Sequence, residues 1–456
     1  PERWEAAKAA SIPLADELAK EQAAATAADW AACRGIATEP DIPGRVARTL
    51  AASGVAGEAR VLLLLFLILV SRLLPRPVSA SVKGPSSGGK SYALERVLEL
   101  FPPDAAYVLT AMSERALVYD DEPLVHRHLV IYEAAGLSGE FATYLVRSLL
   151  SEGRVRYVTV EKTKDGMQPR TIEREGPTGL LLTTTSVRLH PENETRMLSI
   201  PVTDTPAQTR AILRVIAAGE RSPLDRAPWH ALQRWLAAGE RRVEVPFAPV
   251  LADLVPPEAV RLRRDFTTVL TLVRAHALLH WASRATDTLD RIVATPADYG
   301  AVRNLVADLV ADGIGVTVPA TVRETVSAVR TLTEANRAGT LAGKVTDVGE
   351  RTTTVAAVAK AVGLDKSAAL RRVRVATDAG YVQNLEDRKG RPAKLALGEA
   401  LPDDRAILPT LEDLVEGCRV AGVPEGESTP PPPPVGVTGD DAEAADGEEE
   451  RQVWVL

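Results

Sequence analysis

The feature that most constrains this chain is a glycine-rich stretch at residues 84–91, GPSSGGKS, which fits the pattern GxxxxGK[ST]. It follows the β-type run VSASV and precedes the helical run SYALERVLELF. Gly84 and Gly89 allow the backbone N–H groups to face a phosphate, with Gly88 in the same loop. Lys90 neutralises phosphate charge, and the Ser91 hydroxyl can bind Mg²⁺. The strand and helix on either side favour this phosphate loop over a chance glycine loop.

The segment around this loop has the pattern of an α/β domain. Between residues 78 and 205 the short apolar runs AYVLT, HLVIY, GLLLTTT and MLSIPV alternate with helical stretches, which is typical of a covered, mostly parallel sheet. The run VLLLLFLILV from Val61 to Val70 is shorter than the roughly 20 residues that a bilayer requires. It predicts a buried helix packed against the sheet, and no membrane segment.

Composition bounds the class of protein. At about 150 residues per domain, 456 residues predict about three domains. The two cysteines, Cys33 and Cys418, are too few for a disulfide framework or a thiolate zinc site, which fits a cytoplasmic protein. The acidic C-terminal end supplies six of the seven net negative charges, so the rest of the chain is nearly neutral. A surface that binds nucleic acid would therefore have to be a local cluster of positive charge. Because the chain opens at Pro1 without an initiator Met or a leader, we expect a piece of a longer protein.

Patterning divides the chain into five parts. We expect a helical lead-in over 1–58, an α/β phosphate-loop core over 59–204, a helical lid over 205–316, and a basic C-terminal domain over 317–400. The remaining residues, 401–456, are expected to be a linker, a proline run and a disordered acidic tail. The apolar tip of that tail, VWVL, is either solvated or a docking peptide for a protein partner.

Two further strand ends supply candidates for hydrolysis. The strand HLVIY ends at Glu133, which we interpret as the base that polarises the attacking water; the alternative is that Glu133 only begins the next helix. The strand GLLL ends in Thr183 to Thr185, with Thr184 placed to hydrogen-bond the terminal phosphate or the water, although Thr is common in strands. Arg196 lies where assembly would bring it to a neighbouring nucleotide, with Arg188 as competitor and a surface ion pair as the alternative.

This order of parts resembles the AAA+ ATPases over roughly residues 78–315. The resemblance implies an ATPase that binds ATP and Mg²⁺ and assembles as a homo-oligomer, for example a ring, with its sites between subunits. Arg196 then matches the arginine finger, and Arg263 or Arg264 matches the nucleotide-sensing arginine of the lid. Tyr132 departs from the family pattern, which has Asp before the catalytic Glu.

A predicted β-hairpin lies between these two strands, after Glu133 and before Gly179. Residues 154–175 alternate polar and apolar side chains around an Asp-Gly turn. The insertion resembles the pre-sensor-1 hairpin of minichromosome-maintenance and superfamily-3 helicases, which implies that Lys162 and Lys164 contact DNA phosphate. An ordinary solvated hairpin is the alternative.

The segment 351–395 carries ten Lys or Arg residues against four Asp or Glu residues, a net charge of +6 that points to nucleic acid. Two short helices meet at Gly363, and a hairpin follows them. This pattern resembles a MarR-like winged helix-turn-helix domain, although such domains also mediate protein contacts. The expected DNA contacts are on the second helix and on the wing: Arg371, Arg372, Arg374, Lys389 and Arg391.

His276 and His280 lie four residues apart, but without a third ligand we interpret them as packing residues and not as a metal site. Taken together, the parts resemble the helicase half of primase–helicase replication proteins of phages and plasmids. The sequence therefore predicts an ATP-driven DNA motor, with an ATP-gated winged-helix transcriptional regulator as the alternative.

Overall fold

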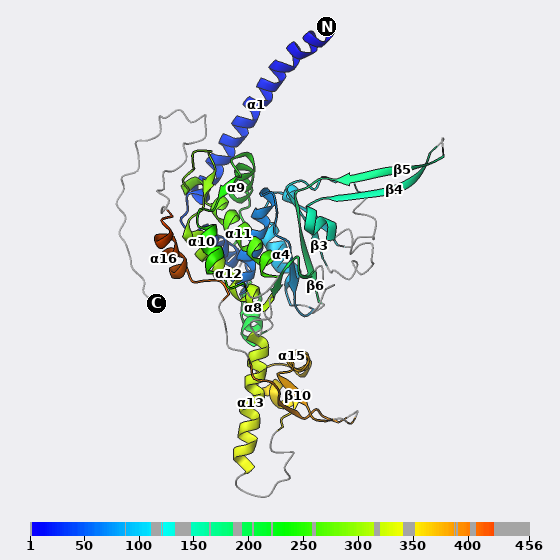
Figure 1. Cartoon of the computed structure of the whole chain (residues 1–456), viewed down its shortest axis with the longest axis vertical. Helices are drawn as coiled ribbons and strands as arrows, with labels where there is room; N and C mark the ends of the chain where they lie inside the picture. The colour runs from blue at the N-terminus through cyan, green and yellow to red at the C-terminus, as the bar shows by residue number, and fades with distance from the viewer. Residues whose placement is uncertain are drawn as a thin grey trace.

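The protein is described by a computed structural model, drawn in Figure 1. The described residues are 2–86, 88–110, 120, 122–132, 147–163, 166–185, 194–202, 205–219, 222–257, 261–313, 320–340, 352–386, 388, 391–401 and 407–423.

A five-stranded sheet in the order β2-β3-β6-β1-β7 forms the centre of the body, and each neighbouring pair is parallel. Its strands are β1 (Ala80–Lys83), β2 (Ala106–Leu109), β3 (Arg127–Ile131), β6 (Thr178–Thr184) and β7 (Leu198–Pro201). The predicted parallel sheet is therefore confirmed. Because neighbouring strands run in one direction, their carboxyl ends, where the glycine-rich loop begins, lie along one edge.

Apolar side chains cover both faces of this sheet. In β6, Leu181 belongs to the main hydrophobic core, whereas Leu180 and Leu182 belong to a smaller cluster on the other face. In β3, Val130 faces the main core and Leu129 faces the smaller cluster. Successive side chains of a strand point to opposite faces, so each strand contributes to both layers.

The apolar run VLLLLFLILV forms α3 (Ala59–Val70), in which nine of twelve residues are buried. It packs against α4 (Lys90–Leu98), the helix that follows the glycine-rich loop, and against α2 (Ile42–Ala52). The predicted buried helix is confirmed. None of the described helices combines the length and the apolarity that crossing a bilayer requires.

Further helices complete the main core. They are α1 (Glu2–Ala37), α9 (Ala227–Ala238), α10 (Ala248–Leu254), α11 (Leu262–Leu279) and α12 (Pro296–Gly313). Their buried side chains, such as Trp229 and Leu272, form one continuous cluster with Leu181 of the sheet. The helices expected as a lid thus share the hydrophobic core of the α/β layer.

A last helix, α16 (Leu411–Ala421), packs against α10 and α12. It buries Leu414 and Cys418, and Thr410 and Asp413 form a capping box at its start. This corrects the expectation that everything after residue 400 is linker and tail, because a short amphipathic helix gains its stability from the surface it covers.

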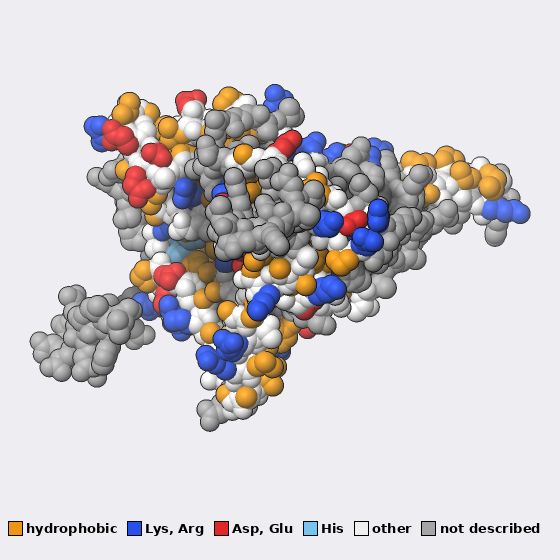
Figure 2. Space-filling view, turned by 90° about the horizontal axis from the view of Figure 1, so that it is seen from below, with side chains coloured by type: hydrophobic (Ala, Val, Ile, Leu, Met, Phe, Trp, Pro, Cys, Tyr) orange, Lys and Arg blue, Asp and Glu red, His pale blue; other side chains and the backbone are white. Residues whose placement is uncertain are grey.

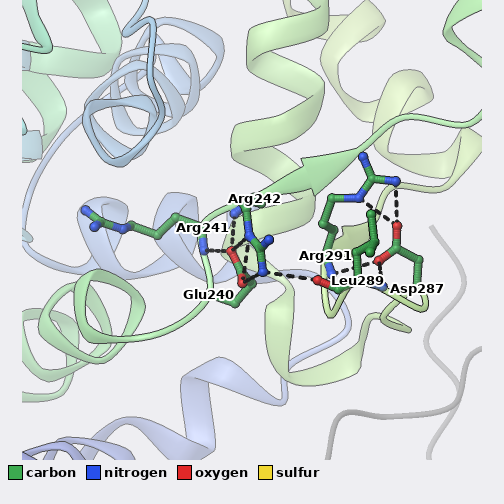
Figure 3. Close-up of polar contacts among 6 residues, drawn as sticks. All are labelled: Glu240, Arg241, Arg242, Asp287, Leu289 and Arg291. Carbon is green, nitrogen blue, oxygen red and sulfur yellow. Dashed lines mark hydrogen bonds and ion pairs between the residues drawn. The ribbon is translucent and has the colours of Figure 1, made fainter.

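Two neighbouring loops of the helical layer are joined by arginines, as Figure 3 shows. Glu240 accepts hydrogen bonds from the guanidinium of Arg242, which also donates to the carbonyl of Leu289 at 3.1 Å. Arg291 donates to Asp287 at 2.7 Å. The hydrogen bond from Arg242 lowers the pKa of Glu240 to about 2, so this carboxylate stays ionised at neutral pH. The contacts connect the loops that flank β8 (Val243–Glu244) and β9 (Ile292–Val293).

Besides the beginning of α1, two parts extend from the body in Figure 1. The predicted hairpin is confirmed as an antiparallel pair, β4 (Val155–Thr163) and β5 (Gly166–Arg174). The basic C-terminal segment forms α13 (Ala320–Thr340), α14 (Val355–Ala361), α15 (Lys366–Asp378) and the antiparallel pair β10 (Val382–Asn384) and β11 (Leu395–Leu397). These C-terminal elements share a hydrophobic cluster of their own, centred on residues such as Val329 and Val358.

One buried histidine of the sheet makes the fold sensitive to acid. His128 in β3 is fully buried, and its Nε2 lies 3.0 Å from the Val78 carbonyl oxygen. Burial lowers the pKa of His128 to about 4, below the usual 6.5. The unfolded chain therefore binds a proton that the folded chain rejects, and stability falls as the pH drops from about 6.5 toward 4.

We expect His128→Gln, which keeps a donor for the Val78 carbonyl, to remove this contribution. Relative to pH 7.5, the wild type should lose about 2 kcal/mol through this residue at pH 5, and the variant should not. Urea unfolding at the two pH values measures the difference. An equal pH dependence in both proteins would contradict this role of His128.

Candidate functional site

The glycine-rich loop connects β1 to α4 at the carboxyl edge of the sheet. The Gly84 N–H donates to the Thr184 carbonyl at 3.3 Å, and a Cβ at Gly84 would lie 2.3 Å from Val202 Cγ2, so only glycine fits there. Gly89 has a φ of 80°, in the left-handed region that favours glycine. Gly88 donates its N–H to the Pro85 carbonyl at 3.1 Å. These contacts curl the loop above the end of the sheet.

Lys90 is the first residue of α4 and is only 7% exposed. Its Nζ donates to the carbonyl oxygens of Gly84 at 3.1 Å and of Pro85 at 2.7 Å. The ammonium therefore lies within the curl of the loop, where an anion bound by the loop would meet it. Ser91 follows on the same helix and is half-buried.

Thr184 lies beside this loop. In the parallel pairing of β6 with β1, Thr184 is opposite Lys83 and Thr183 is opposite Val82, and both threonines are buried. Since the glycine-rich loop starts directly after Lys83, the structure places Thr184 beside the first residue of the loop. The end of β6 and the glycine-rich loop are therefore close together, as the sequence predicts.

The candidate base, Glu133, lies outside the described residues, as does the competitor Arg188. Strand β3, which precedes Glu133, is separated from β1 by β6 and ends at Ile131, opposite Leu182. Tyr132 is half-buried, and burial raises its pKa to about 12. A phenol that stays protonated does not supply the carboxylate that an Asp would supply at this position.

Arg196 lies at the other edge of the sheet. It precedes β7, whose first residue, Leu198, is paired with Ala80 at the amino end of β1. Its Nη1 donates to Ser151 Oγ. Arg264 donates to Thr195 Oγ1 at 3.0 Å and so lies next to Arg196. The sequence predicts that a lid arginine lies over the glycine-rich loop of its own chain. Arg264 instead lies at the amino edge of the sheet, because α11 packs there. Arg263 is exposed on the same helix.

The sequence did not reveal an apolar cavity of about 290 Å³ beside the glycine-rich loop. It is lined by Gly88, Gly89, Val55 and Tyr92 and by one face of α8 (Pro206–Ala218). That face carries Gln208, Ile212, Val215 and Ile216. The signal in the sequence was the helical spacing of Ile212, Val215 and Ile216. None of the residues of α8 is buried, so this apolar face lines the cavity without packing into the core. A flat apolar group linked to phosphate would fit this cavity.

Lys162 is exposed near the end of the β4–β5 hairpin, opposite Met167. Figure 2 shows this arm with hydrophobic side chains along it and Lys or Arg at its far end. Val158, Val160 and Met167 are exposed hydrophobic residues of the arm. Lys164 lies outside the described residues.

The basic residues of α15 divide into two kinds. Arg371 and Arg374 are exposed. Arg372 instead donates to Glu324 of α13 at 2.7 Å, and its side chain is 11% exposed. Through this ion pair Arg372 joins α15 to α13. The sequence analysis instead treats Arg371, Arg372 and Arg374 as equivalent DNA contacts. Arg391 is exposed, and Lys389 lies outside the described residues.

His276 and His280 have a third buried neighbour, Asp298, at a spacing that a metal ion could bridge. Asp298 is already engaged: it accepts from Arg284 at 2.5 Å and lies 2.7 Å from His276 Nδ1. Although burial opposes it, these hydrogen bonds hold the pKa of Asp298 far below its usual value. The structure therefore supplies the third potential ligand that the sequence analysis did not find, and this carboxylate is paired with Arg284. The interpretation of the two histidines as packing residues stays a prediction.

No protein-family model matches this chain, and no curated protein sequence matches it. Two similar solved structures are Drosophila ORC bound to DNA and NtrX from Brucella abortus in complex with ADP. The first is 13% identical, with 80% of this chain and 87% of that chain covered and a TM-score of 0.25. The second is 11% identical, with 72% and 71% covered and a TM-score of 0.24.

Proposed function

We propose that this chain is an AAA+ ATPase that acts on DNA, as a helicase or a related motor at the replication of phage- or plasmid-like elements. The observation that carries the proposal is the position of Lys90. Its ammonium is held inside a glycine-curled loop at the carboxyl edge of a parallel sheet, with an apolar cavity alongside. This arrangement suits a nucleotide whose phosphates meet the loop and whose base enters the cavity.

The residues at this edge divide the work of hydrolysis. Lys90 and the loop N–H groups compensate phosphate charge, and Thr184 orients the terminal phosphate or the attacking water. Glu133 accepts the proton of that water. The oxygen donors of this edge suit Mg²⁺, which Ser91 would hold. Mg²⁺, when bound, supplies further charge compensation.

DNA contact is proposed for the two extended parts. The hairpin presents Lys162, with Lys164, to a phosphate backbone inside a ring of copies. The C-terminal domain is proposed to be a winged helix that places α15 in a major groove, because Arg371 and Arg374 are exposed on that helix. The acidic tail is proposed to meet a protein partner.

One observation favours the alternative, an ATP-gated regulator. A Cβ at Gly363, in the turn between α14 and α15, would lie 3.8 Å from Cγ of Pro206, the first residue of α8. Helix α8 also lines the apolar cavity, so an occupant of the cavity can move the turn that positions α15. A regulator needs this contact between α8 and the turn before α15, but it does not need to move a DNA strand.

Our prediction for nucleotide binding uses two neighbours on α8. Ile212 lines the cavity, whereas Leu213 is 58% exposed and does not. Ile212→Ser should weaken ATP binding about tenfold, because it removes apolar contact with the base worth roughly 1.4 kcal/mol. Leu213→Ser is the matched control. Equal affinities for the two variants, measured by calorimetry, would place the base elsewhere.

For turnover, we expect Lys90→Ala to abolish ATP binding, since it removes the charge that faces the phosphates. Glu133→Gln should bind ATP normally and lose hydrolysis, because only the base is removed. Phosphate release and equilibrium binding are measured together. Full hydrolysis by Glu133→Gln would exclude this base.

For DNA, we expect the double variant Arg371→Gln, Arg374→Gln to bind duplex DNA more weakly. The slope of log K against log salt should fall by about one unit for each lost phosphate contact. Arg372→Gln should leave that slope unchanged, because its guanidinium pairs with Glu324. A fluorescence titration at several salt concentrations measures the slopes, and identical slopes for the double variant and the wild type would remove α15 from the interface.

A further inference from the structure

Three buried side chains meet where α11 ends and α12 begins. His276 is in the last turn of α11, His280 follows the last residue of α11, and Asp298 is in the first turn of α12. Their exposed fractions are 7%, 3% and 0%. One nitrogen or oxygen of each side chain lies within 4.8 Å of those of the other two. None of the three lines the apolar cavity, so the proposed nucleotide site does not use them.

Hydrogen bonds fix the position of the proton on each imidazole ring. His276 Nδ1 lies 2.7 Å from Oδ1 of Asp298, and His280 Nδ1 lies 3.0 Å from the backbone carbonyl oxygen of His276. A carboxylate and a carbonyl both accept, so each Nδ1 has to carry the proton. In the neutral ring, Nε2 is then the nitrogen with a free lone pair. Both histidines therefore keep Nε2 for another ligand.

Asp298 is held as an acceptor by the donors around it. Its Oδ2 accepts from the Thr295 N–H at 2.7 Å and from Arg284 Nε at 3.1 Å, and its Oδ1 accepts from Arg284 Nη2 at 2.5 Å. The carboxylate thus fixes the orientation of the His276 ring. Histidines that bind a metal through one nitrogen typically donate the other N–H to a carboxylate or a carbonyl, as both of these rings do.

The two free nitrogens are open to solvent. The ring centroids of His276 and His280 are 4.4 Å apart, and the ring planes are tilted by 30°. Within the described ranges, neither Nε2 takes part in a hydrogen bond, and neither is among the buried nitrogens that lack a partner. His128 differs, because its Nδ1 is such a buried nitrogen. An ion can therefore reach the two Nε2 atoms, whereas the free nitrogen of His128 is enclosed.

A pair of imidazole nitrogens selects the kind of ion. Imidazole suits Zn²⁺ and its neighbours among the transition metals, whereas Mg²⁺ prefers oxygen ligands. Histidines four residues apart on a helix present their rings on one side, which allows both to bind the same ion. Two of the four positions around Zn²⁺ are then supplied by the protein and the others by water.

We propose that His276 and His280 bind one Zn²⁺ ion, or a similar divalent transition-metal ion, through their Nε2 atoms. Asp298 acts as the residue that positions His276. The bound ion joins the last turn of α11 to the residue that follows the helix, beside the contact with α12. This site goes beyond the proposed ATPase function and does not depend on it. Packing alone, which the sequence predicts for the two histidines, is the alternative that the test decides.

The test is a calorimetric titration of the full chain with ZnCl₂ in the absence of nucleotide, which would itself bind the metal. We expect one Zn²⁺ per chain, and no displacement of this ion by excess MgCl₂. His276→Gln and His280→Gln should each bind Zn²⁺ at least tenfold more weakly, because each loses one of two protein ligands. His230→Gln is the matched control and should bind as the wild type does, since His230 Nε2 already lies 3.0 Å from the Glu99 carbonyl oxygen.

Two outcomes would overturn the metal site and leave packing alone. One is a wild-type chain that does not bind Zn²⁺, and the other is equal Zn²⁺ affinity in the wild type and both histidine variants. A spectrum of the wild type with CuCl₂ tests the ligands without any substitution, because Cu²⁺ prefers the same nitrogen ligands. Electron paramagnetic resonance should show coupling to two imidazole nitrogens, and a signal from oxygen ligands alone would contradict the proposal.

The role of Asp298 has its own test. Asp298→Asn should lower the Zn²⁺ affinity about tenfold, because the carboxylate no longer orients His276. Urea unfolding of the same variant without metal measures its stability separately. A variant that is less stable but binds Zn²⁺ with wild-type affinity would show that Asp298 supports the fold and does not position a metal ligand.

Discussion

A helix that is apolar on every side requires partners on every side, and α3 imposes this requirement on the rest of the body. Nine of its twelve residues are buried. The helix therefore has to lie between layers, where it contacts α4, α2 and α11. Since α4 begins at Lys90, the burial of α3 also fixes the helix that carries the lysine of the glycine-rich loop. The hydrophobic effect that holds the core thus positions the candidate site.

The parallel sheet gives the molecule two chemically different edges. At the carboxyl edge, the glycine-rich loop surrounds one buried ammonium, beside an apolar cavity. At the amino edge, three arginines and several hydroxyls line a polar cleft. Lys83 and Glu194 form an ion pair that ties the end of β1 to the segment before Arg196.

Local patterns in the sequence predicted the local parts of this structure. The glycine-rich loop, the buried helix α3 and the β4–β5 hairpin each depend on neighbouring residues, and each is present. The parallel sheet pairs distant residues such as Ala80 and Leu181, but the alternation of strand-like and helical runs predicted it. The features that were not predicted depend on long-range contacts. The partner of Arg372 is Glu324, 48 residues away, and nothing in the charge pattern of α15 separates Arg372 from Arg371. The apolar cavity likewise combines Val55 with Ile212. The position of Arg264 follows from how α11 packs, and the short helix α16 depends on the surface that it covers.

The central claim is that one chain joins ATP hydrolysis at the Lys90 loop to contact with DNA. The most direct measurement is the rate of phosphate release by the purified chain at saturating ATP, with and without forked DNA, together with strand separation in the same reaction. The account predicts that DNA raises the rate and that strands separate only while ATP is hydrolysed. A rate that is independent of DNA, with no strand separation under hydrolysing conditions, would contradict it.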